Sequence, residues 1–489
     1  MLRHGVSDGS SGAAAAAHAK VKPGSDAVVI GSGPNGLAAA IVLAEAQYSV
    51  TVYEAQDTIG GGLRSAALTR SGYLHDVCSA VHPMGIASPF FRARPLDRHG
   101  LEWIQPAYPL AHPFDDGSAA VLQNDLAATC AGLGRDGRAY NRVVGHVVRQ
   151  WSDLEPLFFG PPRPPANPIH AARFGLAALR SCSGLARAQF RTVKARGLFA
   201  GLAAHSVGPL DRAGTAAIGI VLAAAAHVHG WPIPRGGAQS IANALSRHLA
   251  NLGGTVTTGR RIDSLAELGA DLVLADVTPR GLLRLAGEKL SGGYRRALEA
   301  FRYGPGVFKV DWALSDPIPW EAAECRSAGT VHVGGTLEEI EDAERAPFAS
   351  RHADRPFVLL AQPSLFDPSR APAGRHTAWA YCHVPHGSTE DMTERIERQV
   401  ERFAPGFGAC IIARSARGPA DLERGNENLI GGDITGGDNS LKQLFMRPTW
   451  RHYATPISGL YLCSSSTPPG GGVHGMCGLH AASLAVRRR

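Results

Sequence analysis

The sequence has no C-x-x-C pair, although 8 of its 489 residues are cysteine. Scattered cysteines supply neither the ligand spacing of a zinc site nor a redox-active dithiol, so we expect no metal site and a reducing compartment. Residues 1–25 also lack the Leu- or Val-rich stretch of a secretory signal, and their alanine run is interrupted by His18 and Lys20. We therefore expect a disordered leader at 1–25 and a cytoplasmic protein.

Acidic residues are absent from residues 156–210, which carry seven positive charges, a number equal to the net charge of +7. Arg173, Arg180, Arg187 and Lys194 recur every seven residues and would form one stripe on a continuous helix, although intervening glycines weaken such a helix. The stretch is typical of a membrane-surface element that attracts anionic lipid, or of an ordinary solvated face, and both remain open. The stretch contains no recognisable nucleic-acid-binding module, which argues against nucleic-acid binding.

Apolar runs long enough to span a membrane are missing as well. Ala213–Ala226 is a largely apolar run of only 14 residues, so we expect a buried helix there rather than a span. Hydrophobic residues make up 44% of the chain and charged residues 19%, a composition typical of a folded globular protein. At 489 residues the chain exceeds one ordinary core, and two closely packed domains are expected.

A nucleotide-binding pattern occupies residues 26–55, which read DAVVIGSGPNGLAAAIVLAEAQYSVTVYEA. The pattern predicts a short buried strand at 27–30, a G-x-G-x-x-G turn, a helix, and a second strand at 49–53 that ends in an acid. The first glycine makes the turn, the second admits a pyrophosphate, the third allows close helix–strand packing, and the acid is placed to bind a ribose hydroxyl. The residues expected to contact the nucleotide here are Gly31, Gly33, Pro34, Asn35, Gly36, Glu54 and Ala55.

The glycine-rich stretch IGGGLRS follows at residues 59–65. A GG-R-S segment just after the acid resembles the flavoprotein family that contains phytoene desaturases and amine oxidases. The phrases PNGLAAAI, WPIPRGG, GPGVFKVDWAL, GGDITGG and PPGGGVHGMCGLHAA are similar to those of its phytoene-dehydrogenase-like subgroup. The resemblance implies that FAD is the cofactor and that the following residues run beside its pyrophosphate toward the flavin: Gly61, Gly62, Leu63, Arg64 and Ser65.

The end of the sequence also spells G-x-G-x-x-G, at Gly470, Gly472 and Gly475. No acid-tipped strand follows this match, so we interpret it as incidental rather than as a second nucleotide site. The resemblance instead implies that a strand at 460–463 and a helix from about residue 475 return to the FAD domain. The loop between them would lie against the flavin, with these contacts: Gly471, Gly472, Val473 and His474.

A third cofactor segment is expected in the middle of the chain, where a helical stripe at 241–252 precedes strands near 255–258 and 270. By resemblance, the region of Ile262 passes near the adenine. We therefore expect an α/β fold: a Rossmann-like FAD-binding domain from residues 26–90, 231–300 and 450–489, joined to a mixed α+β substrate domain from 91–230 and 301–449. The segment 156–230 is a candidate membrane-contacting part of the substrate domain.

A second nucleotide domain for NAD(P)H is not found, so we expect flavin to be reduced by an organic substrate and reoxidised by O2, a quinone or another acceptor. The leading hypothesis is oxidation, such as desaturation, of a hydrophobic isoprenoid or lipid-like substrate by hydride transfer to flavin N5. The alternatives are a polyene isomerase or saturase, an amine oxidase, and a non-catalytic lipid-binding escort protein. His82 and His474 are the candidate proton-relay residues, and Lys309 is expected to be a structural ion-pair partner.

Overall fold

A parallel five-stranded sheet is built around the first strand of the described chain. The structure, a computed structural model, describes residues 26–488, and the leader expected at 1–25 lies outside them. The strands, all paired in parallel, take the order β16-β10-β1-β2-β9. They are β1 (Asp26–Ile30), β2 (Ser49–Tyr53), β9 (Thr255–Thr257), β10 (Leu272–Ala275) and β16 (Leu460–Leu462). The strands predicted from the sequence are thus confirmed to within two residues.

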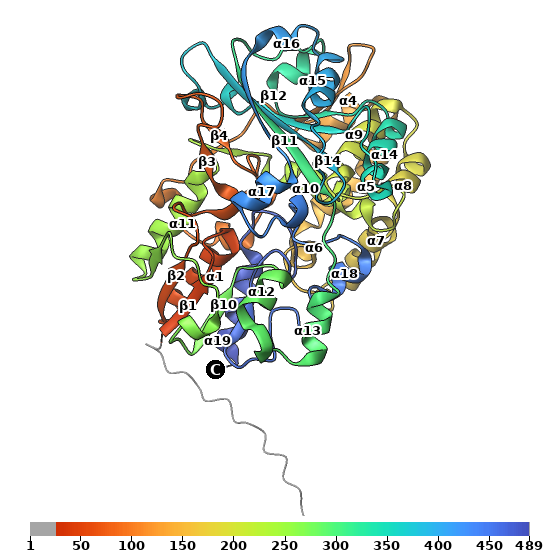
Figure 1. Cartoon of the computed structure of the whole chain (residues 1–489). Coiled ribbons are helices and arrows are strands. Elements are labelled where there is room, and N and C mark those ends of the chain that lie inside the picture. The colour runs from red at the N-terminus through yellow and green to blue at the C-terminus, as the bar shows by residue number, and fades with distance from the viewer. Residues whose placement is uncertain (1–25, 489) are drawn as a thin grey trace, which may run out of the picture.

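Helices cover both faces of this sheet, as a parallel sheet requires (Figure 1). Ala27 and Val29 of β1 share a core with α1 (Pro34–Glu45), α11 (Gln239–Asn251) and α19 (Met476–Arg487). Val28 and Ile30 point the other way and share a core with α12 (Pro279–Ala286) and α13 (Gly292–Glu299). The sheet therefore has the Rossmann-like α/β arrangement that the glycine-rich turn predicts.

A mixed seven-stranded sheet forms the second layer, seen in the upper part of Figure 1. Its order is β15-β11-β14-β13-β12-β6-β7, and only β12 and β6 pair in parallel. The strands are β6 (Tyr108–Pro113), β7 (Ala119–Leu122), β11 (Gly306–Leu314), β12 (Ala328–Val333), β13 (Val358–Ala361), β14 (His376–Val384) and β15 (Ile411–Arg417). One face packs on α15 (Thr393–Glu401) and α16 (Phe407–Cys410) in an apolar core, which leaves the other face to border the rest of the molecule.

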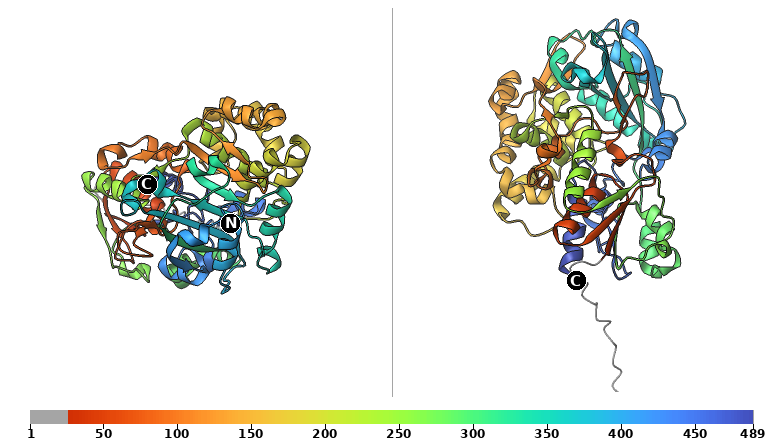
Figure 2. Two further views of the ribbon diagram at one scale, coloured as in Figure 1. Left: turned by 90° about the horizontal axis from the view of Figure 1, so that it is seen from above. Right: turned by 90° about the vertical axis from the view of Figure 1, so that its left-hand side faces the viewer.

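A layer of helices lies beside the seven-stranded sheet (Figure 2). It comprises α4 (Leu126–Gly132), α5 (Gly137–Arg149), α6 (Trp151–Phe158), α7 (Pro168–Ala178), α8 (Cys182–Gln189), α9 (Val193–Ala204) and α10 (Thr215–His229). The helix α10 is buried along most of its length, as its apolar sequence predicts. No helix between residues 26 and 488 is both long and apolar enough to cross a membrane.

The seven-residue stripe of positive charges does not form on one helix. Arg173 lies in α7, Arg187 in α8 and Lys194 in α9. Two hydroxyl side chains cap new helices within the stretch, because Ser181 accepts a hydrogen bond from the Gly184 N–H and Thr192 from the Ala195 N–H. The stripe is therefore broken, an outcome that the sequence left open, and the stretch remains basic.

Shorter elements connect the layers. They are β3 (Ser65–Ala66), β4 (His75–Asp76), α2 (Pro83–Ile86), α3 (Pro89–Arg92), β5 (Trp103–Ile104), β8 (Ile233–Pro234), α14 (Leu337–Arg345), α17 (Pro419–Gly425) and α18 (Leu441–Met446).

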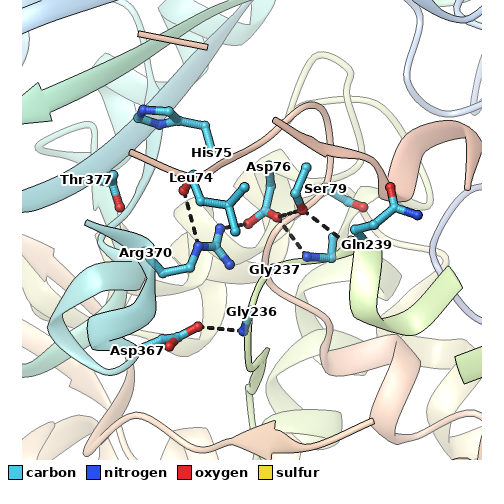
Figure 3. A network of polar contacts seen from close by, with 12 residues as sticks. Leu74, His75, Asp76, Ser79, Gly236, Gly237, Gln239, Asp367, Arg370 and Thr377 are labelled. Atoms are coloured by element: carbon cyan, nitrogen blue, oxygen red, sulfur yellow. Dashed lines mark hydrogen bonds and ion pairs between the residues drawn. The ribbon is translucent and has the colours of Figure 1, made fainter. Parts of the chain in front are cut away.

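A buried ion pair and the hydrogen bonds around it join β3, β4, the turn before α11 and residues 367–370 (Figure 3). Asp76 pairs with Arg370 and accepts hydrogen bonds from the Ala238 N–H, at 2.7 Å, and from Ser65 Oγ, at 2.7 Å. The Gly236 N–H donates to the Asp367 carboxylate at 2.7 Å. The turn that leads into α11 is thereby tied both to β4 and to residues 367–370.

Candidate active site

One cavity of about 1160 Å³ lies between the two sheets and the helical layer. Its lining includes the turn after β1, the end of β2, strands β12, β13 and β14, and helices α7, α10 and α18. Sequence segments far apart therefore contribute side chains to one site.

The turn after β1 requires glycine at each position of its motif. Gly31 has a positive φ of 96°, a conformation that side chains rarely adopt. A Cβ on Gly33 would lie 2.7 Å from the Asp276 carboxylate, and one on Gly36 would lie 2.0 Å from the Gly31 carbonyl oxygen. Gly33 is also the N-cap of α1, so the positive end of this helix lies at the cavity wall. The turn has the form that binds a pyrophosphate.

Glu54 lies at the carboxyl end of β2 and lines the cavity. Its carboxylate accepts hydrogen bonds from Ser32 N, at 3.0 Å, Ser32 Oγ, at 2.6 Å, and Gln56 N, at 2.9 Å. Arg64 lies 3.4 Å from the same carboxylate and also donates to the Gly425 carbonyl at 2.9 Å. An acid fixed at this strand end is positioned as the ribose-binding acid of the motif.

Asp276 is a site residue that the sequence analysis missed. It follows β10, its side chain accepts a hydrogen bond from the Gly36 N–H at 2.9 Å, and it lines the cavity. Burial raises the pKa of Asp276 to about 7, while the Gly36 hydrogen bond opposes the shift and Glu54 adds to it. A signal was present in the sequence, because an acid directly after a buried parallel strand lies at the edge where ligands bind.

Most of the residues predicted to bind the cofactor line this cavity. Those that do are Gly31, Gly33, Pro34, Asn35, Glu54, Ala55, Gly61, Gly62, Arg64, Ile262, Gly471, Gly472, Val473 and His474. Gly36, Leu63 and Ser65 lie outside the lining. Gly36 packs against the backbone of Gly31 within the turn. Leu63 belongs to the hydrophobic core, and Ser65 Oγ donates a hydrogen bond to Asp76.

His474 and His82 are both buried in the cavity wall. His474 Nδ1 accepts a hydrogen bond from the Met476 N–H at 3.1 Å, and its backbone carbonyl accepts one from Ser88 Oγ. His82 Nε2 has no hydrogen-bond partner within residues 26–488. Burial lowers the pKa of each imidazole to about 4, so both are neutral at pH 7. A neutral imidazole has one bare ring nitrogen, which can accept a proton.

Lys309 lies in β11 beside this site, and it is fully buried. Its ammonium group pairs with Asp311 at 2.5 Å. The sequence-based expectation of a structural ion pair agrees with this geometry.

Arg447 is a second residue that sequence reasoning missed, because no motif surrounds it. Its side chain is fully buried, lines the cavity and donates to the Gly437 carbonyl at 3.1 Å. Nε and Nη1 have no partner among the described residues. Unpaired buried guanidinium donors are costly, and they fit a ligand that presents an anionic or carbonyl oxygen.

The described residues form no candidate metal site. Among residues 26–488, no group of three His, Cys, Asp or Glu side chains is placed to hold a metal ion. All eight cysteines are free thiols.

Comparison with known proteins identifies the glycine-rich turn and gives relatives along the full chain. Residues 29–92 match a model described as an NAD(P)-binding Rossmann-like domain. The mouse pyridine nucleotide-disulfide oxidoreductase domain-containing protein 2 is 26% identical, over 96% of this chain and 95% of its own. The phytoene dehydrogenase of Streptomyces griseus is 27% identical, over 81% of this chain and 82% of its own.

Solved structures share the fold. An oxidoreductase from Methanosarcina mazei has a TM-score of 0.64 and 15% identity, covering 95% of this chain and all of its own. A putrescine oxidase bound to putrescine has a TM-score of 0.62 and 16% identity, covering 95% of this chain and 98% of its own. The Rossmann-like turn and the relatives named phytoene dehydrogenase and phytoene desaturase make the chain similar to phytoene-desaturase-like oxidoreductases.

Proposed function

We propose that the protein binds FAD and uses it to oxidise, for example by desaturation, a hydrophobic isoprenoid or lipid-like molecule. The observation that carries the proposal is the 1160 Å³ cavity, because it joins the nucleotide-binding turn to the apolar surfaces of α7, α10 and α18. A pocket that is mostly apolar with a few polar groups is typical of a small-molecule site, and this one is large.

The residues present fit a flavin dinucleotide. In the proposed complex, the turn from Gly31 to the start of α1 holds the pyrophosphate, and Glu54 holds the adenosine ribose. Arg64 and the loop 471–474 border the space that remains. Arg447 supports this assignment, because its unpaired donors would gain an oxygen acceptor. Bound flavin would supply the hydride acceptor, and the chain supplies binding, orientation and proton handling.

His82 is the residue we propose as the proton acceptor. Its Nε2 is unpartnered among the described residues and its imidazole is neutral at pH 7, as a base requires. His474 is engaged through Nδ1 with the start of α19, so we propose that it shapes the loop as well as bordering the substrate. O2 or a quinone would reoxidise the flavin.

We propose that each of the two sheets belongs to a separate domain. The FAD domain comprises residues 26–90, 231–300 and 450–489, and the substrate domain comprises 91–230 and 301–449. We further propose that the substrate enters between α7 and α18, where Leu179 and Phe445 line the cavity and are 57% and 55% exposed. This rim would rest against a membrane surface, in an otherwise cytoplasmic protein.

The test is the visible spectrum of the purified protein, followed by anaerobic dithionite and then air. We expect flavin bands that bleach and return, and an FAD released on denaturation. Gly33→Leu should lose the flavin, because its side chain would meet Asp276 and fill the pyrophosphate position. Gly132→Leu is the matched control, since a Cβ on this exposed glycine would meet no atom within 4 Å. A colourless wild-type protein that takes up no FAD would overturn the proposal.

A further inference from the structure

The face of the seven-stranded sheet toward the cavity carries polar side chains within an otherwise apolar wall. Register places Thr330, Ala361 and Trp379 in one row across β12, β13 and β14, and His332, Leu359 and Tyr381 in the next. Thr330, Leu359, Trp379 and Tyr381 line the cavity. Neighbours in such a row lie about 5 Å apart, so one bound molecule can contact several of them.

A histidine pair adjoins these rows. His205 is the C-cap of α9 and lines the cavity, and its Nε2 lies 3.1 Å from His332 Nε2. His332 is fully buried, and its Nδ1 has no partner among the described residues. That nitrogen lies against Gly201, where a Cβ would approach it to 2.7 Å. Burial lowers the pKa of both imidazoles, that of His205 to about 3, so each carries one proton at pH 7.

The contacts of the pair decide which nitrogens carry those protons. A buried N–H without an acceptor costs more than a bare ring nitrogen, so His332 Nδ1 is unprotonated and His332 Nε2 carries the hydrogen. This hydrogen is donated to His205 Nε2, because the two atoms are within hydrogen-bond distance. The proton of His205 is therefore on Nδ1, which has no acceptor within residues 26–488 and belongs to a cavity-lining side chain.

Tyr381 supplies a second unused polar group. Its ring stacks on Trp379 with 5.8 Å between centroids, which fixes the side chain against the sheet. Its hydroxyl has no hydrogen-bond partner among the described residues, and burial raises its pKa, so it remains a neutral O–H group. The cavity wall thus presents an N–H donor from the end of α9 and an O–H donor from β14.

We propose that the cavity takes an oxygenated apolar molecule, an aldehyde, ketone or alcohol on a long apolar skeleton, whose oxygen accepts hydrogen bonds from His205 Nδ1 and Tyr381 Oη. A plain hydrocarbon would cover both donors without pairing them, and sites built to hydrogen-bond a ligand reject analogues that lack the oxygen. This inference rests on the proposed function and narrows its substrate class.

Binding of matched ligands tests the proposal without turnover. The probes are a C20 polyene aldehyde, the alcohol, and the hydrocarbon of the same skeleton, added anaerobically to the purified flavin-containing protein. Quenching of tryptophan fluorescence reports binding, since Trp231 and Trp379 line the cavity. We expect the aldehyde and alcohol to bind about tenfold or more tightly than the hydrocarbon.

Variants separate hydrogen bonding from packing. His205→Phe and Tyr381→Phe should each reduce the ratio of aldehyde or alcohol affinity to hydrocarbon affinity by about three- to tenfold. The affinity for the hydrocarbon itself should stay unchanged or rise. His205→Asn keeps an N–H near the position of Nδ1 and should therefore retain part of the preference for the aldehyde and alcohol over the hydrocarbon. His376→Phe, outside the cavity lining, is the control.

Equal wild-type affinities for the three ligands, or variants that weaken all three alike, would overturn the inference. Absence of binding by every ligand would overturn it as well. The flavin spectrum of the same samples tests the proposed function separately, because it shows whether the protein contains the cofactor.

Discussion

Asp276 is the buried acid beside the phosphate-binding turn, and its titration has a consequence for stability. Its pKa is about 7 in the folded protein, against a reference value of 3.8 for a free side chain. Because the folded state holds a proton that the unfolded chain releases, the contribution of Asp276 to stability is greatest below pH 4 and falls as pH rises to about 7. We expect Asp276→Asn to increase the free energy of unfolding at pH 8 by up to about 4 kcal/mol, and therefore to raise Tm. Near pH 4.5 the substitution should change both quantities little.

Thermal unfolding of the flavin-free protein from pH 4.5 to 8 measures this difference. Asp263→Asn is the control, because that carboxylate is largely exposed and should change Tm little at either pH. Parallel Tm curves for wild type and Asp276→Asn across the range would contradict the prediction.

At the residue scale, the sequence predicts those site residues that belong to a local motif. Glu54 is recognisable because the turn, helix and strand before it fix its position. Asp276, Arg447 and His205 carry no motif, and they reach the cavity only through chain crossings that local periodicity does not encode. Of these, Asp276 had a readable signal as the acid after a buried strand.

The contact between α1 and α19 is the element-scale feature on which the nucleotide domain depends. A Cβ on Gly478 would lie 1.9 Å from the Asn35 carbonyl oxygen, so α19 packs directly on the backbone of α1. Gly478→Val should separate the helices, lower stability by about 1–3 kcal/mol and reduce flavin binding at the start of α1. Gly293→Val in α13 is the control, because its Cβ would meet no atom within 4 Å. Equal flavin content and unfolding midpoints in the two variants would refute this.

The rim formed by α7 and α18 gives a prediction about membranes. Leu176, Leu179 and Phe445 are all more than half exposed there. Replacing the three with Ser should reduce flotation with anionic liposomes several-fold, because apolar insertion and charge act together. Arg187 is a poor choice for this test, since it is bound to Glu341 of α14 at 2.6 Å. Unchanged flotation of the triple variant, with flavin content intact, would rule out the rim as the contact.

Element positions follow the sequence where its periodicity is strong. The strands around the turn, the apolar α10 and the returning α19 are all found. The charge stripe is broken because Ser181 and Thr192 start new helices as N-cap residues, and charge spacing alone does not indicate where a helix ends.

At the scale of the whole molecule, the Asp76–Arg370 pair connects segments from different parts of the chain. Burial would raise the pKa of Asp76, but Arg370 and the surrounding hydrogen bonds lower it below its usual value. Arg370→Met would leave a buried, unpaired carboxylate and should cost about 3–5 kcal/mol at pH 7. The cost should shrink toward pH 4, because the unpaired acid then takes up a proton.

Urea unfolding at pH 5 and pH 8 measures this effect. The double variant Asp76→Asn/Arg370→Met should recover much of the loss, since Asn still accepts from the Ala238 N–H. A double variant as unstable as Arg370→Met alone would show that the pair acts through packing rather than charge.

Long-range assembly is the part that sequence reasoning reaches least. The five-stranded sheet draws strands from 26–53, 255–275 and 460–462, and the seven-stranded sheet draws them from 108–122 and 306–417. A family resemblance predicts this interleaving, whereas strand patterns alone do not. The domain boundaries given above stay a prediction.

The pairing of α1 with α19 also has a consequence for biosynthesis. About 430 residues separate the two helices, which a ribosome adds in roughly 20–90 s at ordinary elongation rates. During that time the apolar flank of α1 is without its native cover, and the nascent chain is open to chaperone capture. Cofactor loading is therefore expected after translation of α19, late in the life of the nascent polypeptide.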